Sequence, residues 1–405
     1  MCARRVVGEE ASWSGVFPVP ARCSSPRRRA VVLAAAVAVA AGTSRTTPPP
    51  AGAAPPARVL SRYETAASGN AIDRDCGFSA PLPGRPGGSV WLFCDTVWTG
   101  ARRGLWLGAT AATGPALPGR VPTGLTELPT PAGAGIAAAP SPPGPGAAPQ
   151  GFLGTPPGLV LPGGAPCRVP GTAYSASWVS GAARPPGTGA LLVAYTDVCV
   201  HGTTISTQGF GLVEYRPGEN ALTGRARVFS LPAGLPFQQN LGSPVFSGGY
   251  LYLFASVCDA HGPGACLGGR VTLARVRADP SAWRDPAAYE YRTSGGWTRD
   301  AFQASTVVAG AAPYAVHVAD YTALGRGLVM VEQRGLDGRF RLWRAPAPEG
   351  PWRAAGDGIV PCSGGSGLDQ CRALIGHPGL STRGALLLSY YDPAADHVTV
   401  RAVPW

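Results

Sequence analysis

The chain has 405 residues, of which 45% are hydrophobic, and it contains 57 glycines and 43 prolines. This hydrophobic fraction excludes a wholly disordered chain, and turn residues around short apolar runs are typical of an all-β fold. The formal net charge is +11 and is carried by arginine without lysine, but the arginines after residue 42 are scattered, which excludes a basic nucleic-acid-binding arm.

The N-terminus has the features of an export signal. Arg27–Arg29 precede an apolar run, Ala30–Ala41, which ends in the small residues Ala40, Ala41 and Gly42. This order predicts a signal peptide over residues 1–42. The run is too short to span a bilayer comfortably, and no cysteine stands at the cleavage point, so we expect no stable membrane anchor. A disordered Pro/Ala/Thr linker is expected over residues 43–57.

Eight cysteines follow the predicted signal peptide, and an even number in an exported chain predicts disulfides. By spacing, the neighbouring pairs are Cys76/Cys94, Cys167/Cys199, Cys258/Cys266 and Cys362/Cys371. Zinc would need C-x-x-C pairs or histidine partners, which the sequence lacks. We therefore predict a secreted, extracellular protein, and we expect it to be a monomer.

An irregular repeat runs through residues 58–405. Five apolar and aromatic runs each end in a polar or acidic residue: Val90–Asp95, Leu191–Asp197, Leu251–Ser256, Leu328–Gln333 and Leu386–Asp392. Each follows another strand-like run: Cys76–Leu82, Ala173–Val179, Gly242–Phe246, Tyr314–Ala319 and Ile375–Leu380. Five units of three or four antiparallel strands predict a five-bladed β-propeller. A pair of β-sandwiches is the alternative fold.

Two segments depart from the regular repeat. The last unit ends at Trp405 after only three strands, and the run Arg58–Tyr63 could supply its missing outer strand. This N-terminal strand would close the ring and remove an exposed edge. The low-complexity stretch over residues 130–164 is too long for an ordinary turn, so we predict an inserted surface loop.

A pair of carboxylates flanks the first two of these cysteines. Residues that face each other in an antiparallel ladder have a constant index sum, so a Cys76–Cys94 disulfide places Asp75 opposite Asp95. Like charges at this range favour binding of a proton or a cation. Paired carboxylates also serve retaining glycosidases, where one acts at the anomeric carbon, directly or through water, and the other protonates the leaving oxygen. Turn capping and a metal site, with calcium as the ion, are the alternatives.

Other residues on or beside the first and second strands of the units are candidates for substrate binding. They are Asp73, Trp98, Asn240, Ser243, His317, Glu332 and His377. Trp98 and Trp106 could stack on sugar rings, although aromatic residues in blades more often serve packing. His317 lies within an alternating apolar run, which favours a core histidine. His377, before Pro378 at the expected start of an inner strand, is the stronger candidate.

Two short motifs resemble known proteins. Arg74–Ser79 (RDCGFS) followed by Trp91–Thr96 (WLFCDT) resembles the opening blade of five-bladed propeller glycosidases and related secreted actinobacterial proteins, which read R-D-x-G-[FY]-S and then W-x-F-G-D-T. His377–Ser381 with Leu388–Asp392 is similar to their last blade. The resemblance implies a furanoside or arabinan-type polysaccharide, from a cell wall or a plant, as substrate. It also matches Asp75 and Asp95 to the two acidic positions of the first blade.

The chain departs from the arabinanase pattern in its later blades, where those enzymes place a general-acid Glu and a further Asp. Unit two offers Ser175 and Ser177 instead, and unit three offers Asn240 and Ser243. Two functions therefore stand: a glycoside hydrolase that uses the paired carboxylates, and a non-catalytic glycan-binding or adhesion propeller. A structural surface protein is a third. A pocket around both carboxylates would favour the enzyme, and a flat rim with arginine salt bridges would favour the others.

Overall fold

The computed structural model describes residues 58–62, 72–98, 105–122, 124–136, 148–156, 158–160, 164, 166–167, 173–202, 204–230, 240–262, 265–362, 371–392 and 397–405. The predicted signal peptide and linker lie outside these residues. No helix in the described part of the chain has the length and hydropathy that a membrane crossing requires.

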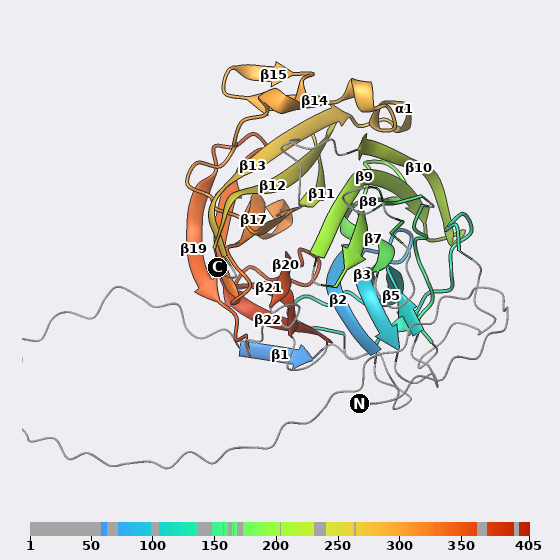
Figure 1. Ribbon diagram of the computed structural model, residues 1–405. Helices are drawn as coiled ribbons and strands as arrows, with labels where there is room; N and C mark the ends of the chain where they lie inside the picture. Colours follow the sequence, from blue (N-terminus) through green and yellow to red (C-terminus); the bar gives the residue numbers. More distant parts are fainter. Residues whose placement is uncertain are drawn as a thin grey trace, which may run out of the picture.

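Five antiparallel sheets surround a common axis, which confirms the predicted five-bladed β-propeller (Figure 1). Blade 1 contains β2 (Ile72–Pro81), β3 (Gly88–Trp98), β4 (Leu105–Leu107), β5 (Thr110–Pro115) and β6 (Thr126–Glu127). Blade 2 contains β7 (Ala173–Ala183), β8 (Leu191–His201), β9 (Thr204–Arg216) and β10 (Ala221–Ser230). Blade 3 contains β11 (Asn240–Ser247), β12 (Tyr250–Gly262), β13 (Ala265–Arg277), β14 (Glu290–Thr293) and β15 (Gly296–Thr298). Blade 4 contains β16 (Ala315–Asp320), β17 (Leu328–Gln333), β18 (Arg339–Ala345) and β19 (Arg353–Ile359). Blade 5 contains β20 (Arg372–Gly376), β21 (Ala385–Asp392) and β22 (His397–Pro404).

Short helical turns lie on the connections of blades 3 and 4. They are α1 (Pro280–Trp283), η1 (Pro286–Ala288), η2 (Ala301–Gln303) and η3 (Thr322–Leu324). α1 and the β14–β15 hairpin lie at the outer edge of the ring (Figure 1). In the sheet of blade 5, β1 (Arg58–Arg62) lies beside β22. Closure of the ring by this strand stays a prediction.

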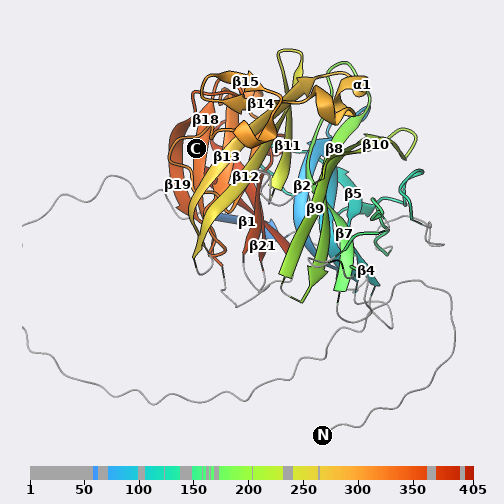
Figure 2. The ribbon, with the colours of Figure 1, turned by 45° about the horizontal axis from the view of Figure 1, so that its top comes forward.

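The first strands of the five blades form the inner wall. β2 packs against β7, β7 against β11, β11 against β16, β16 against β20, and β20 returns to β2. Figure 2 shows β2, β7 and β11 next to one another around the axis. Strands that are far apart in the sequence are therefore neighbours near the axis.

The core is divided among the interfaces between blades, each of which holds its own apolar cluster. Leu92 and Val193 share the cluster between blades 1 and 2, and Phe254 and Met330 share that between blades 3 and 4. Because each blade packs against a neighbour on both faces, its second strand is buried on both faces, and ten successive residues of β8 are buried. Such strands read as continuous apolar runs rather than alternating ones. Such runs are easy to find in a sequence, and the structure confirms all five predicted second strands.

The first strand of blade 5 differs from the prediction, which placed it at residues 375–380. The strand is β20, and His377 follows it in a turn. The carbonyl oxygen of His377 accepts hydrogen bonds from the amides of Leu380 at 3.2 Å and Ser381 at 2.9 Å. Pro378 has no N–H to donate to a ladder. The prediction that His377 starts an inner strand is therefore wrong.

The stretch over residues 130–164 also differs in part from a surface loop. Phe152 and Leu153 are buried in the cluster between blades 1 and 2, and the Phe152 ring lies 5.1 Å from that of Tyr215. Gly151 forms a backbone bridge with Thr110 of β5. These apolar residues anchor part of the insertion against the two blades.

Candidate functional site

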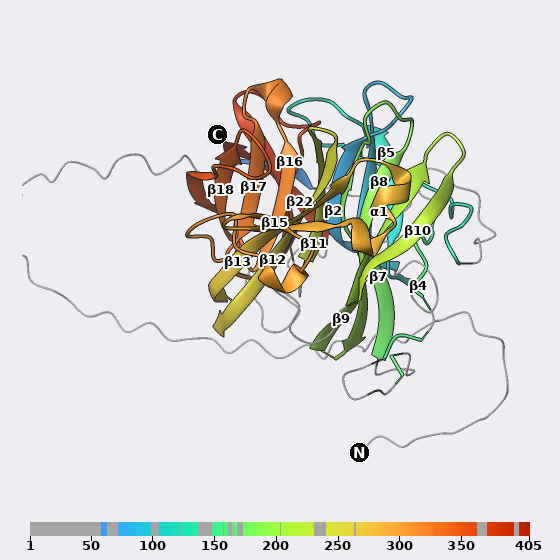
Figure 3. The same cartoon turned by 90° about the horizontal axis from the view of Figure 1, so that it is seen from above.

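One face of the ring collects the disulfides. The inner strands begin on this face and the second strands end there, because neighbouring strands are antiparallel. At these strand ends the structure forms disulfides Cys76–Cys94, Cys167–Cys199, Cys258–Cys266 and Cys362–Cys371, with Cα–Cα distances of 5.5 to 5.7 Å. The β8–β9 and β12–β13 hairpins project beyond the ring on this side (Figure 3). We call this face the disulfide rim.

Asp75 lies at an interruption of the ladder between β2 and β3. Arg74 pairs with Thr96 and Phe78 with Leu92, as the index-sum argument expects, but Cys76 pairs with Phe93. Cys76 and Gly77 have positive φ angles of 64° and 95°. The bulge leaves Asp75 outside the regular pairs, so the prediction that Asp75 stands directly opposite Asp95 in the ladder is wrong. Bulges commonly re-aim a side chain in this way.

The Asp95 carboxyl group is held by two side chains of blade 2. The Trp178 Nε1–H donates to Oδ1 at 2.6 Å, and the Tyr174 hydroxyl donates to Oδ2 at 2.7 Å. Burial and the charge of Asp75 raise the pKa of Asp95 to about 8, although both hydrogen bonds and the charge of Arg372 act in the opposite direction. Asp95 therefore holds a proton near neutral pH.

The Asp75 carboxylate has a different environment. The Arg372 Nε–H of blade 5 donates to its Oδ2 at 3.0 Å, and the Arg372 guanidinium lies 4.1 Å from the centre of the Tyr391 ring. The other oxygen of Asp75, Oδ1, is buried and has no hydrogen-bond partner in the described part of the protein. Asp75 thus faces a cation with one oxygen and leaves the other free, while blades 5, 1 and 2 meet at the pair.

These contacts do not suit a metal ion. Potential ligand atoms of Asp75, Cys76 and Cys94 lie within 4.8 Å of one another, but the two sulfurs are bonded to each other. Calcium takes six to eight oxygen ligands. The groups that contact the two carboxylates are instead N–H and O–H donors.

Two of the predicted binding residues have structural contacts. Glu332 is fully buried in blade 4 and accepts hydrogen bonds from the amide of Ala312 at 2.7 Å and from the indole of Trp343 at 2.6 Å. Ser243 Oγ accepts a hydrogen bond from the amide of Val318 at 3.0 Å and so joins β11 to β16. These contacts satisfy the polar groups of the two side chains within the fold.

The two histidines lie together in the inner wall rather than against the carboxylates. His377 is fully buried, and its Nδ1 lies 2.7 Å from Ser79 Oγ. His317 Nδ1 accepts a hydrogen bond from the amide of Gly376 at 3.3 Å. Burial lowers the pKa of His317 to about 4 and that of His377 to about 3, so both rings are neutral. His377 follows the last residue of β20, whereas Arg372 is its first residue and lies on the disulfide rim.

The remaining candidates divide into three cases. Asp73 and Trp98 lie on the disulfide rim, paired with Val97 and Ile72 respectively. Asn240 begins β11, but its side chain lies outside the described part of the structure. Trp106 of β4 packs edge-on against Tyr174 with ring centroids 4.2 Å apart, so it lies next to a residue that contacts Asp95.

Arg372, Tyr174 and Trp178 were not among the predicted site residues. Arg372 directly follows Cys371, just as Asp75 directly precedes Cys76. Tyr174 and Trp178 occupy a run that was predicted as a strand, and their separation by four residues places both on one face of it. The signal was therefore present, but it required knowing which blades are neighbours on the disulfide rim.

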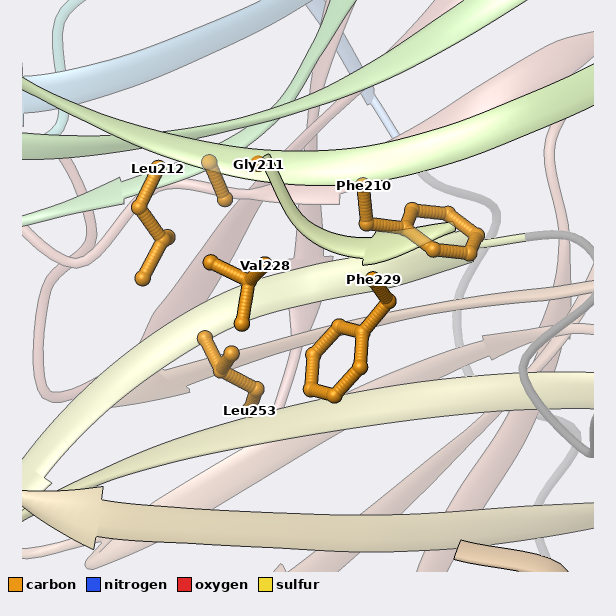
Figure 4. Close-up of a pocket in the computed structure, with 7 residues that line it drawn as sticks. Phe210, Gly211, Leu212, Val228, Phe229 and Leu253 are labelled. Carbon is orange, nitrogen blue, oxygen red and sulfur yellow. The ribbon is translucent and has the colours of Figure 1, made fainter. Parts of the chain in front are cut away.

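A small cavity lies elsewhere, between blades 2 and 3 (Figure 4). Its walls include Phe210, Leu212, Phe229 and Leu253, which belong to the apolar cluster at that interface. The residues that line it carry no titratable side chain. We therefore assign this cavity to core packing.

The chain matches no family model, and no curated protein is similar to it. Among solved structures it resembles a candidate hydrolase from Bacteroides ovatus, with 16% identity, a TM-score of 0.54, and coverage of 82% of this chain and 85% of that one. A family 117 glycoside hydrolase from Zobellia galactanivorans has 10% identity, a TM-score of 0.47 and coverage of 86% and 90%. An α-L-arabinofuranosidase from Fusarium graminearum has 10% identity, a TM-score of 0.39 and coverage of 86% and 98%. At 16% identity, the similarity to the Bacteroides ovatus structure shows a shared fold alone.

Proposed function

We propose that the protein is a glycoside hydrolase in which Asp95 protonates the leaving oxygen and Asp75 acts at the anomeric carbon. The observation that carries the proposal is the contrast between the two carboxyl groups. Asp95 has its pKa raised to about 8, whereas Asp75 faces Arg372 and keeps Oδ1 free. Titratable groups whose environments differ in this way are typical of an acid and a base that work together.

The geometry gives each group a task. Arg372 stabilises the negative charge of Asp75 and fixes Oδ2. Oδ1 is buried and has no hydrogen-bond partner among the described residues, and we assign to it the action at the anomeric carbon, either directly or through a water molecule. Asp95 gives its proton to the departing oxygen and becomes a carboxylate. If Asp75 attacks the anomeric carbon directly, the Asp95 carboxylate then removes a proton from the incoming water; if Asp75 activates the water, Asp75 takes that proton. Mutual repulsion with Asp75 favours return of a proton to Asp95 and completes the cycle.

We further propose a furanoside-type polysaccharide or a cell-wall glycan as the substrate, on the resemblance of the first and last blades. Trp106 and Tyr174 offer aromatic surface beside Asp95, and sugar rings stack on such surfaces. The stereochemistry of the first product, read by NMR, would distinguish direct attack by Asp75 from attack by water.

A glycan-binding propeller without catalysis is the second candidate. The ion pair between Arg372 and Asp75 favours it, because an arginine and a carboxylate together can bind sugar hydroxyl groups. In that case Asp75 and Asp95 would contact the glycan without changing it.

Digestion of arabinan, arabinogalactan and xylan separates the two candidates. We expect the native protein to release sugar from one of them and Asp75→Asn to lose on the order of 10³-fold in rate, with Asp337→Asn, an exposed site, as the matched control. Retained near-ultraviolet circular dichroism would show that the variant is folded. Binding of a glycan without release of sugar would overturn the hydrolase in favour of the binding module.

We also propose that the protein is exported by cleavage after the leader and that β1 closes the ring. Four disulfides are consistent with an oxidising compartment, and the pairing of β1 with β22 supports closure. N-terminal sequencing of the secreted protein tests the first proposal. Deletion of residues 58–62 tests the second, since the exposed edge of β22 should lower the free energy of unfolding.

A further inference from the structure

The two oxygens of Asp95 contact groups with different hydrogen-bonding capacities. Oδ1 lies 2.6 Å from the indole Nε1 of Trp178, and Oδ2 lies 2.7 Å from the hydroxyl of Tyr174. An indole N–H can only donate, whereas a phenol hydroxyl can both donate and accept. Oδ1 must therefore act as the acceptor whether or not Asp95 is protonated.

This difference locates the proton of Asp95. When the carboxyl group is neutral, we place its proton on Oδ2, because the carbonyl oxygen is the better acceptor and Oδ1 accepts from Trp178. In this neutral state the 2.7 Å contact reverses: Oδ2–H donates to Tyr174 Oη, whereas the Tyr174 hydroxyl donates to Oδ2 when Asp95 is ionised. The hydrogen of Tyr174 must turn away from Asp95, so the phenol becomes the donor that faces outward from the pair.

The position of Tyr174 fits such a role. It is the second residue of β7, at the strand end on the disulfide rim, and it is only half-buried. The Trp106 ring packs edge-on against its ring at 4.2 Å. The Cys167–Cys199 disulfide joins the segment before β7 to β8. The phenol is thus held by Asp95 at its hydroxyl and by Trp106 at its ring.

We propose that Tyr174 delivers the proton of Asp95 to the leaving oxygen, an inference that rests on the proposed hydrolase function. As the glycosidic bond breaks, the Tyr174 O–H bond breaks and its proton forms a bond to the leaving oxygen. In the same step the proton on Asp95 Oδ2 moves to Tyr174 Oη. Tyr174 ends as a neutral phenol, Asp95 as a carboxylate, and the glycosidic electron pair stays on the departing alcohol.

The surrounding groups support this direction of transfer. Asp75 from β2 and Arg372 from β20 are the charged groups that act on both Asp95 and Tyr174, and Trp178 of β7 is a fixed donor. Burial and the two carboxylates raise the pKa of Tyr174 far above its usual value. A free phenolate is therefore disfavoured, so the two protons must move together.

Tyr174→Phe tests the proposal, because it removes the hydroxyl and keeps the ring against Trp106. The control is Tyr215→Phe, whose hydroxyl donates to Asn220 within blade 2. Two substrates are compared. The first is the polysaccharide that the native protein cleaves among arabinan, arabinogalactan and xylan. The second is a 2,4-dinitrophenyl glycoside of the sugar released from that polysaccharide, and its leaving group needs no proton. We expect Tyr174→Phe to lose about 100-fold in kcat on the polysaccharide and to stay within about twofold on the dinitrophenyl glycoside.

A second readout is the dependence of kcat on the fraction of deuterium in the solvent. It should curve for the native protein, with two protons in motion, and become linear for Tyr174→Phe. An equal loss on both substrates, or no loss on either, would overturn the role of Tyr174 while leaving the hydrolase intact. Failure of the native protein to cleave either substrate would overturn the hydrolase itself and this inference with it.

Discussion

Asp95 in blade 1 and Asp197 in blade 2 end the same apolar run of the repeat, yet they have opposite surroundings. Asp197 is fully buried, with Arg227 at 3.0 Å, Arg225 at 3.6 Å and the Ser177 hydroxyl at 2.6 Å. Asp95 contacts a phenol and an indole, and burial together with a second carboxylate raises its pKa. One acid is neutralised by two cations, whereas the other is kept in its protonated form.

Glu332 of blade 4, next to last in its own run, is a third case. It is fully buried, with Trp343, the amide of Ala312 and, at 3.7 Å, Arg334 around it. The position in the repeat thus brings an acid close to the disulfide rim but does not decide its chemistry. The partners on neighbouring strands decide it, and for Asp95 they come from the adjacent blade.

The largest difference between the two acids should appear in stability. Asp197→Ala leaves Arg225 and Arg227 close together without their shared carboxylate, and we expect a loss of about 3 kcal/mol in the free energy of unfolding. Asp95→Asn leaves the Asp75–Arg372 ion pair in place and keeps a neutral side chain of the same shape, so it should not lower the free energy of unfolding at this pH. Urea unfolding of both variants at pH 7 measures the two changes in the free energy of unfolding. Equal losses in the two variants would contradict the proposed difference between the acids.

The two acids should also differ in the pH dependence of stability. The pKa of Asp95 is raised from 3.8 to about 8 on folding, so the folded state favours the protonated form. The stability that this group contributes is present below about pH 4 and is lost as the pH rises through about 8. Asp95→Asn should therefore gain stability relative to the native protein between these values, and the difference should stay constant above pH 8.

Denaturant unfolding from pH 4 to pH 9 gives this difference directly. A difference that is constant over the whole range would show that Asp95 ionises as an ordinary carboxyl group. Asp95 and Asp197 would then not differ in their protonation state at neutral pH.

Much of the fold could be predicted because the second strand of a propeller blade is an unbroken apolar run that is visible in the sequence. The run Leu191–Asp197 is buried on both faces of its blade, and such burial requires an unbroken series of apolar residues. The first strand of blade 5 was misplaced because the apolar residues of Ile375–Leu380 continue into a turn. There Leu380 packs in the cluster between blades 5 and 1 without being in a strand.

The candidate site was predictable only within one blade. The spacing of Cys76 and Cys94 brought Asp75 toward Asp95, although the bulge at Cys76 changes the register there. Arg372 and Tyr174 come from blades 5 and 2, and nothing in the local pattern states which side chains of neighbouring blades meet. Contacts of this kind depend on how the five sheets close around the axis.

The most direct test of the account is the titration of the Asp95 carboxyl group, followed by carbon-13 NMR in the native protein and in Asp75→Asn. We predict a pKa of about 8 in the native protein, and a lower value in the variant because the neighbouring charge is gone. A pKa near 3.8 in both proteins would contradict the account, since Asp95 would then be a carboxylate at neutral pH with no proton to give.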